Sequence, residues 1–108
     1  MKKIVDSRTE IMGTLEIEEG TEVFAPNLQK AGRILIYEKA ILNAIKLKKS
    51  GDILIYKNGT INAQNLQYSG DIWIYKNGSL TAPNLQQSGD IDIRENGILN
   101  APKINQKY

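Results

Sequence analysis

The sequence predicts an all-β fold, a right-handed single-stranded β-helix (β-solenoid) of about five coils, and three observations support this prediction. Glycine recurs every 19 residues, at Gly13, Gly32, Gly51, Gly70 and Gly89, and an alanine column and a leucine column keep the same spacing. Within each unit a short segment alternates with period two, which is the pattern of a strand. No segment has the length or the 3.6-residue period of a helix. Units of 19 residues cannot bury a core alone, so they must stack.

Each unit has the same predicted elements in the same order. Residues 71–75 alternate as a first strand, and the turn signal Asn77-Gly78 follows, since both residue types tolerate positive φ. Residues 79–82 form a second extended piece, and Pro83-Asn84 turns the chain again so that Leu85 points inward. A hairpin at each Asn-Gly is the alternative. We reject it because the flanking segments differ in length and pattern, whereas stacking uses the 19-residue match.

Alternation defines which side chains enter the core. The first strand contributes Leu15/Ile17, Ile34/Ile36, Ile53/Ile55, Ile72/Ile74 and Ile91/Ile93. The second piece contributes Val23, Leu42, Ile61, Leu80 and Leu99, followed by Ala25, Ala44, Ala63, Ala82 and Ala101. The third side contributes Leu28, Leu47, Leu66, Leu85 and Ile104. The alanine column indicates a tight corner.

The chain is expected to form a single domain over residues 1–108. Residues 1–12 match the unit poorly and are expected to form an irregular N-terminal cap coil with Ile4 in the core, while residues 13–108 hold the five repeats. A solenoid leaves unpaired strand edges at its ends, which proteins normally cover. Either the polar tail after Ile104 blocks the upper edge or another chain covers it, so end-to-end stacking is one possible mode of oligomerisation.

Composition excludes several classes of function. The chain has no Cys and no His, which removes disulfides, the usual zinc sites and Cys or His catalysis. The net charge of +2 is too small to indicate nucleic acid, and no run approaches the about 20 apolar residues that span a bilayer. No signal peptide is evident, so a soluble and by default cytoplasmic protein is expected, with the compartment itself unknown. No cofactor, metal or catalytic residue is expected, because acidic residues occur in repeated columns rather than in a unique cluster.

One outward face departs from the rest of the surface. Its members are large apolar or aromatic side chains of the middle three copies: Leu35, Tyr37, Leu54, Tyr56, Trp73 and Tyr75. We call this array the Tyr-Leu-Trp face. The outer copies carry charges at the same positions, Glu16 and Glu18 on one side and Asp92 and Arg94 on the other. An apolar patch with a polar rim is typical of a binding surface, although tyrosine columns also stabilise sheets by cross-strand stacking.

Three other surface features have plainer interpretations. Asp52, Asp71 and Asp90 form a column that resembles a cation site, but Asp after Gly at a corner usually accepts a hydrogen bond from a backbone N–H, which we favour. In the next charged column Glu38–Lys57 and Lys76–Glu95 are expected to form weak ion pairs. Basic residues gather at Lys30, Arg33, Lys46, Lys48 and Lys49. A solvated corner is the favoured interpretation there, over contact with phosphate or nucleic acid.

The string Ala-Pro-Asn-Leu-Gln-x-Ser-Gly-Asp-Ile-x-Ile at residues 82–93 resembles the repeats of short leucine-rich-like β-solenoids in phage and gut-bacterial proteins. It is also similar to the Gly-x-Leu-x-Ile-x-x-Asn-x-x-Leu repeat of receptor L-domain and leucine-rich-repeat surface proteins. The likeness covers residues 13–104 and implies a binding or structural module. The absence of a helical convex segment favours a narrow closed β-helix over a horseshoe.

The sequence therefore predicts a non-catalytic protein-interaction or structural repeat module, not an enzyme. Its expected partner is another protein or a second copy, as a homodimer through the Tyr-Leu-Trp face or the coil ends, with nucleic acid and membrane disfavoured. A carbohydrate-binding module is one alternative, because aromatic ladders stack on sugar rings, although Leu35 and Leu54 suit protein partners better. A small phage-encoded inhibitor of a host defence complex is another, which the resemblance alone implies.

Overall fold

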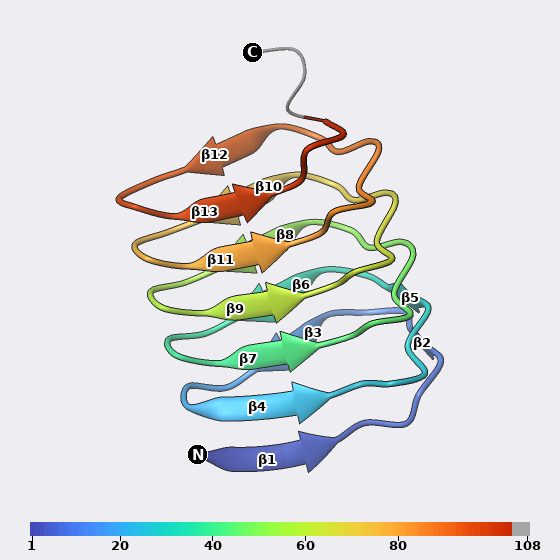
Figure 1. The fold of residues 1–108 in the computed structure, drawn as a ribbon. Coiled ribbons are helices and arrows are strands. Elements are labelled where there is room, and N and C mark those ends of the chain that lie inside the picture. The colour runs from blue at the N-terminus through green and yellow to red at the C-terminus, as the bar shows by residue number, and fades with distance from the viewer. Residues whose placement is uncertain (105–108) are drawn as a thin grey trace.

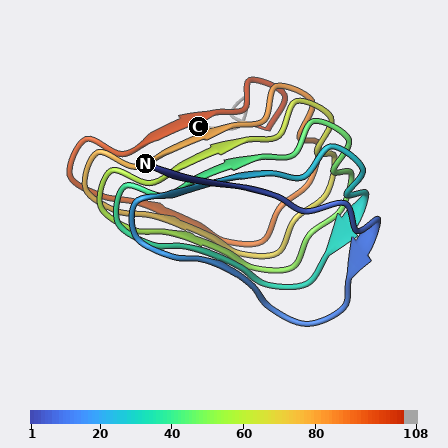
Figure 2. The same cartoon turned by 90° about the horizontal axis from the view of Figure 1, so that it is seen from below.

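The computed structural model describes residues 1–104, and these residues form a right-handed β-solenoid. The chain climbs in stacked coils from the N-terminus, with strands of the front sheet running to the right and strands of the rear sheet running to the left (Figure 1). The view from below shows the same rotation and an elongated cross-section (Figure 2). The predicted fold class is therefore confirmed. Among the described residues no helix is long and apolar enough to cross a membrane.

Two parallel sheets form the long sides of the solenoid. The rear sheet has the strand order β12-β10-β8-β6-β3, and the front sheet has the order β1-β4-β7-β9-β11-β13. The rear strands are β3 (Leu15–Ile17), β6 (Ile34–Ile36), β8 (Ile53–Ile55), β10 (Ile72–Ile74) and β12 (Ile91–Ile93). The front strands are β1 (Lys2–Val5), β4 (Thr21–Phe24), β7 (Ile41–Asn43), β9 (Thr60–Asn62), β11 (Ser79–Thr81) and β13 (Ile98–Asn100). On the short third side β2 (Glu10–Ile11) pairs with β5 (Lys30–Ala31).

Register follows the repeat, because each residue pairs with its equivalent in the next coil. Ile34 pairs with Ile53 and Ile53 pairs with Ile72, a step of 19 residues each time. The 19-residue period of the sequence is thus the circumference of one coil. Like residues therefore lie above like residues, and a side chain's column decides whether it is buried.

The core contains the predicted columns in all but the last coil. Within the first four units every predicted inward side chain is buried, and Ile53, Ile55, Ile72 and Ile74 are fully enclosed. Ile11, Thr21, Ala31 and Ala40 are also buried, although the alternation did not assign them to the core. In the last unit Ala101 is buried, Ile91, Leu99 and Ile104 are half-buried, and Ile93 is 41% exposed. The expectation of five equal core layers is wrong there, because among the described residues no coil covers the top of the fifth.

An N-terminal cap coil, residues 1–12, precedes the first of the five repeat coils. β1 pairs with β4 at the regular spacing, Ile4 with Val23, but β2 pairs with β5 one residue out of step, Ile11 with Ala31. The register of Ile4 is that of the core column, yet Ile4 is 40% exposed, so its predicted burial is wrong. β1 is the edge of its sheet, so Ile4 has a neighbouring coil on one side only. The expected role of the polar tail falls on residues 105–108, outside the described residues.

In the turn after the first strand of the third and fourth units, asparagine rather than the following glycine adopts the positive φ. Asn58 and Asn77 have φ of 59° and 57°, whereas Gly20 is the only described glycine with a positive φ. Gly78 is therefore not required by its backbone conformation. It is required by packing, because a Cβ there would lie 2.9 Å from Cγ2 of Ile55. The asparagine makes the turn and the glycine leaves room for the isoleucine beneath it.

Lys39 occupies the same left-handed turn position with φ of 61°, and we expect Lys39→Asn to stabilise the protein. The gain should be about 0.5–1 kcal/mol, since this conformation costs an ordinary side chain about 1–2 kcal/mol and asparagine less. Denaturant unfolding measures the change, with Lys76→Asn as the control because Lys76 is exposed and lies one position before the turn residue Asn77. Equal stability changes in the two variants would contradict the assignment of strain to Lys39.

Candidate functional site

The structure brings all six residues of the Tyr-Leu-Trp face together on the rear sheet. Leu35, Leu54 and Trp73 are the central residues of β6, β8 and β10 and lie in direct register. The three tyrosines each follow the end of one of these strands. All six side chains are half-buried, because their inner atoms pack on neighbours in the column while their outer atoms meet solvent. The face is a continuous surface of three coils by two columns.

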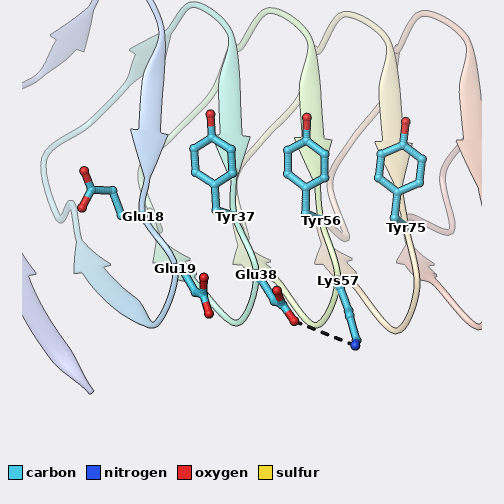
Figure 3. A pocket seen from close by; sticks show the side chains of 7 residues that line it. All are labelled: Glu18, Glu19, Tyr37, Glu38, Tyr56, Lys57 and Tyr75. Carbon is cyan, nitrogen blue, oxygen red and sulfur yellow. Dashed lines mark ion pairs between the residues drawn. The ribbon is translucent and has the colours of Figure 1, made fainter.

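The tyrosines form a stacked row along the solenoid axis. The ring centroids of Tyr37 and Tyr56 are 5.5 Å apart with planes parallel to within 1°, and those of Tyr56 and Tyr75 are 5.7 Å apart at 22°. These are offset-stacked distances, which contribute about 0.5–1.5 kcal/mol per pair beyond area burial. The three hydroxyl groups point the same way (Figure 3). The row is therefore a stacked aromatic surface whose rings hold one another in place.

A groove follows the tyrosine row on its side toward the turn. It has a volume of about 590 Å³ and is lined by Glu18, Glu19, Tyr37, Glu38, Tyr56, Lys57 and Tyr75 (Figure 3). We call it the tyrosine groove. Lys57 pairs with Glu38 at 3.9 Å, which confirms one predicted ion pair and neutralises that part of the wall. Glu18 and Glu19 leave the lower end of the groove acidic.

Charged residues close the face at both ends, as the sequence indicates. At the lower end the hydroxyl of Tyr37 donates a hydrogen bond to Glu16 at 2.8 Å, and this bond raises the pKa of the Tyr37 phenol. At the upper end the guanidinium of Arg94 donates to Asp92 at 3.1 Å, which raises the pKa of Arg94. Each of the two columns of the face thus has a charged residue at both ends. The expected pair Lys76–Glu95 does not form in residues 1–104, where Arg94–Asp92 is the pair of the top coil.

The aspartate column acts within the stack. The carboxylate of Asp52 accepts a hydrogen bond from the backbone N–H of Asp71 at 2.9 Å, and that of Asp71 accepts one from Asp90 at 2.8 Å. This confirms the backbone interpretation, with the detail that the N–H belongs to the next coil. Over residues 1–104 no cluster of acidic side chains has a geometry that could hold a metal ion.

Most of the predicted basic residues lie on the third side of the coil, whereas Arg33 comes two residues before Leu35. Lys30 and Lys49 are register neighbours on the short third side, and Lys46, Lys48 and Arg33 are exposed around them. The ammonium of Lys49 lies 5.7 Å from the ring centroid of Tyr68, a cation–π distance. This contact ties Lys49 to the surface of the solenoid itself.

The sequence located the face but not the groove. The column of Glu19, Glu38 and Lys57 indicates only ion pairs along the axis, because a repeat pattern shows neighbours along the axis more clearly than neighbours within a coil. These residues follow Glu18, Tyr37 and Tyr56 by one position, and that adjacency is the signal that predicts a wall beside the row. No protein-family model, curated protein or solved structure matches the chain. The site must therefore be interpreted from its own geometry.

Proposed function

We propose that this protein is a non-catalytic protein-interaction module that self-associates through the Tyr-Leu-Trp face. The observation that supports the proposal best is the continuity of this face: three coils contribute six large apolar or aromatic side chains, and charges replace them in both outer coils. A single exposed hydrophobic residue is ordinary on a protein surface, whereas a contiguous patch with a polar rim is typical of an interface. Tyr and Trp are also the residue types that dominate binding energy at interfaces.

The character of the site favours binding over catalysis. The face consists of side chains repeated at equivalent positions, and its polar groups are engaged with each other, as in Tyr37–Glu16 and Arg94–Asp92. A catalytic site requires a nucleophile or a general acid or base held apart from its neighbours in reach of a substrate. A stacked aromatic surface instead loses little conformational entropy on association, which is an advantage for recognition.

The solution mass of the wild type and of Trp73→Glu tests this function. We expect the wild type to be a dimer at micromolar concentration and Trp73→Glu to be a monomer, because the variant replaces the largest apolar side chain of the face with a carboxylate that association would bury. Trp73→Phe should remain dimeric. Asn62→Glu adds the same charge to the exposed outer surface of β9 on the opposite sheet and should not change the mass. A wild type that stays monomeric at all concentrations would overturn the self-association.

A carbohydrate-binding module is the second candidate, supported by the parallel tyrosine rings beside carboxylates in the tyrosine groove. Such rings can stack on sugars while carboxylates accept hydrogen bonds from hydroxyl groups. Leu35 and Leu54 offer a sugar neither kind of contact, so the protein-binding function accounts for more of the face. The fluorescence of Trp73, the only tryptophan, would respond to oligosaccharides only under the second candidate.

A further inference from the structure

The two ends of the Tyr-Leu-Trp face differ in charge. The lower end carries two carboxylates, Glu16 and Glu18, and therefore a charge of −2, while Asp92 and Arg94 at the upper end sum to zero. Both ends are ordered by hydrogen bonds, Glu16 to Tyr37 and Arg94 to Asp92. This asymmetry constrains how two copies of the face can pack on each other, because a symmetric dimer places the same patch on both sides.

In such a dimer the two-fold axis lies in the plane of the interface, and it has two simple orientations there. An axis along the solenoid would place the acidic lower ends of the two copies against each other, so that four carboxylates meet. An axis along the strands turns one copy upside down, so that each acidic end meets the other copy's upper end. In that orientation Leu35 faces the partner's Trp73, Tyr37 faces the partner's Tyr75, and Tyr56 meets itself. Net charge favours the second orientation, because it sets −2 against 0 at each end, whereas the first sets −2 against −2 at the lower end. In the second orientation Glu18 faces the partner's Arg94, although Glu16 faces the partner's Asp92.

We propose that two copies pair about a two-fold axis parallel to the rear strands and that Arg94 of each copy enters the acidic end of the other copy's tyrosine groove. This arrangement rests on the proposed function, and it adds the orientation of the partner and a specific contact. The tyrosine groove is incomplete without that cation, because Glu18 and Glu19 lie at its end while Lys57 is already paired with Glu38. The second copy is the occupant whose charge and position both fit.

Arg94 can make this contact while it stays paired with Asp92, because only its Nε and Nη2 donate to Asp92 and a guanidinium carries five N–H donors. Its side chain is 65% exposed, and it occupies the position in the fifth coil that tyrosine occupies in the three coils below. A planar guanidinium binds carboxylates through paired hydrogen bonds and packs on aromatic rings. In the groove it would meet Glu18 and Glu19 beside the ring of Tyr37. The symmetry produces the contact twice in each dimer.

Charge exchange tests the arrangement through Glu18→Arg, Arg94→Glu and the double variant, with dimer dissociation measured by sedimentation. We expect each single variant to weaken the dimer about tenfold or more, because a like-charge contact replaces an attractive one at both ends. The double variant should recover most of the affinity. Glu18 and Arg94 belong to different coils at opposite ends of one chain, so recovery can only come from a contact between chains. The exposed residues Glu10 and Lys48 supply charge-matched controls as Glu10→Arg and Lys48→Glu.

The outcomes separate this proposal from the function on which it rests. A dimer that Trp73→Glu dissociates, but that tolerates both charge reversals, would keep the self-association and overturn the orientation. The orientation would also be overturned if both single variants dimerise weakly and the double variant does not recover the affinity. Thermal unfolding of each variant should match the wild-type monomer, since Glu18 and Arg94 are exposed. A wild type that is monomeric throughout would overturn both proposals and would leave a basic segment of another protein as the occupant of the tyrosine groove.

Discussion

Ile55→Ala should lower the free energy of unfolding by about 2–5 kcal/mol, the range for deleting a large aliphatic side chain from a tight core. Ile55 is fully buried in β8, in the central coil, with equivalent isoleucines in register directly above and below it. Neither neighbouring coil can move into the space without breaking the ladder of backbone hydrogen bonds. The cavity therefore stays open, which places the cost toward the upper part of the range. Chemical denaturation followed by far-ultraviolet circular dichroism measures it.

Ile93→Ala is the matched control, because Ile93 occupies the same column in the fifth coil. Ile93 is 41% exposed and has a coil on one side only, so its removal should cost well under half as much. This contrast follows from a stack in which each coil contacts only its neighbours. Equal losses at the two positions would contradict the end-coil description. They would indicate instead that a further layer, such as the end of a second copy, covers the fifth coil.

Most of the fold was predictable because one column repeated five times carries more information than any single element. The 19-residue spacing determines register, and alternation then determines burial, as at Ile53 and Ile55. The same reasoning fails at the ends. A repeat treats Ile55 and Ile93 as equivalent, whereas burial depends on the number of neighbouring coils. Ile4 fails for the same reason at the other end of the solenoid.

The turn and the tyrosine groove show a second limit of sequence reasoning. Asn77 and Gly78 both tolerate positive φ, so composition cannot say which of them takes it, and the choice depends on the methyl group of Ile55 one coil below. The sequence also does not show that the corner after Tyr37 places Glu38 in the wall of the groove. The six residues of the face were identified because column membership alone brings them together. Their role in binding remains a prediction.

Gly70→Ala should destabilise the protein by about 1–3 kcal/mol, the usual range for forcing extra atoms into a filled site. A Cβ at Gly70 would overlap the carboxylate oxygen of Asp52 and would lie 3.0 Å from the Asp52 backbone nitrogen. That carboxylate accepts the backbone N–H of Asp71, so the new methyl group would expel it and break the bond between coils. Gly70 and Gly89 are therefore required by the aspartates one coil below, Asp52 and Asp71, since neither glycine has a positive φ to explain it. Gly32 and Gly51 instead face backbone atoms of the coil below.

A double-mutant cycle with Asp52→Ala tests that dependence. Asp52→Ala alone should cost about 1 kcal/mol through the lost hydrogen bond. Adding Gly70→Ala to it should cost less than Gly70→Ala costs in the wild type, because the expelled carboxylate is already absent. Residues in contact give such coupling energies of about 0.5–3 kcal/mol. Rescue should be partial, since the close approach to the Asp52 backbone remains. If the two stability losses simply add, the cost of Gly70→Ala comes from the clash with the Asp52 backbone and not from the carboxylate. A coupling would show that glycine is required at position 70 because it accommodates the carboxylate of Asp52 one coil below, as Gly89 does for Asp71.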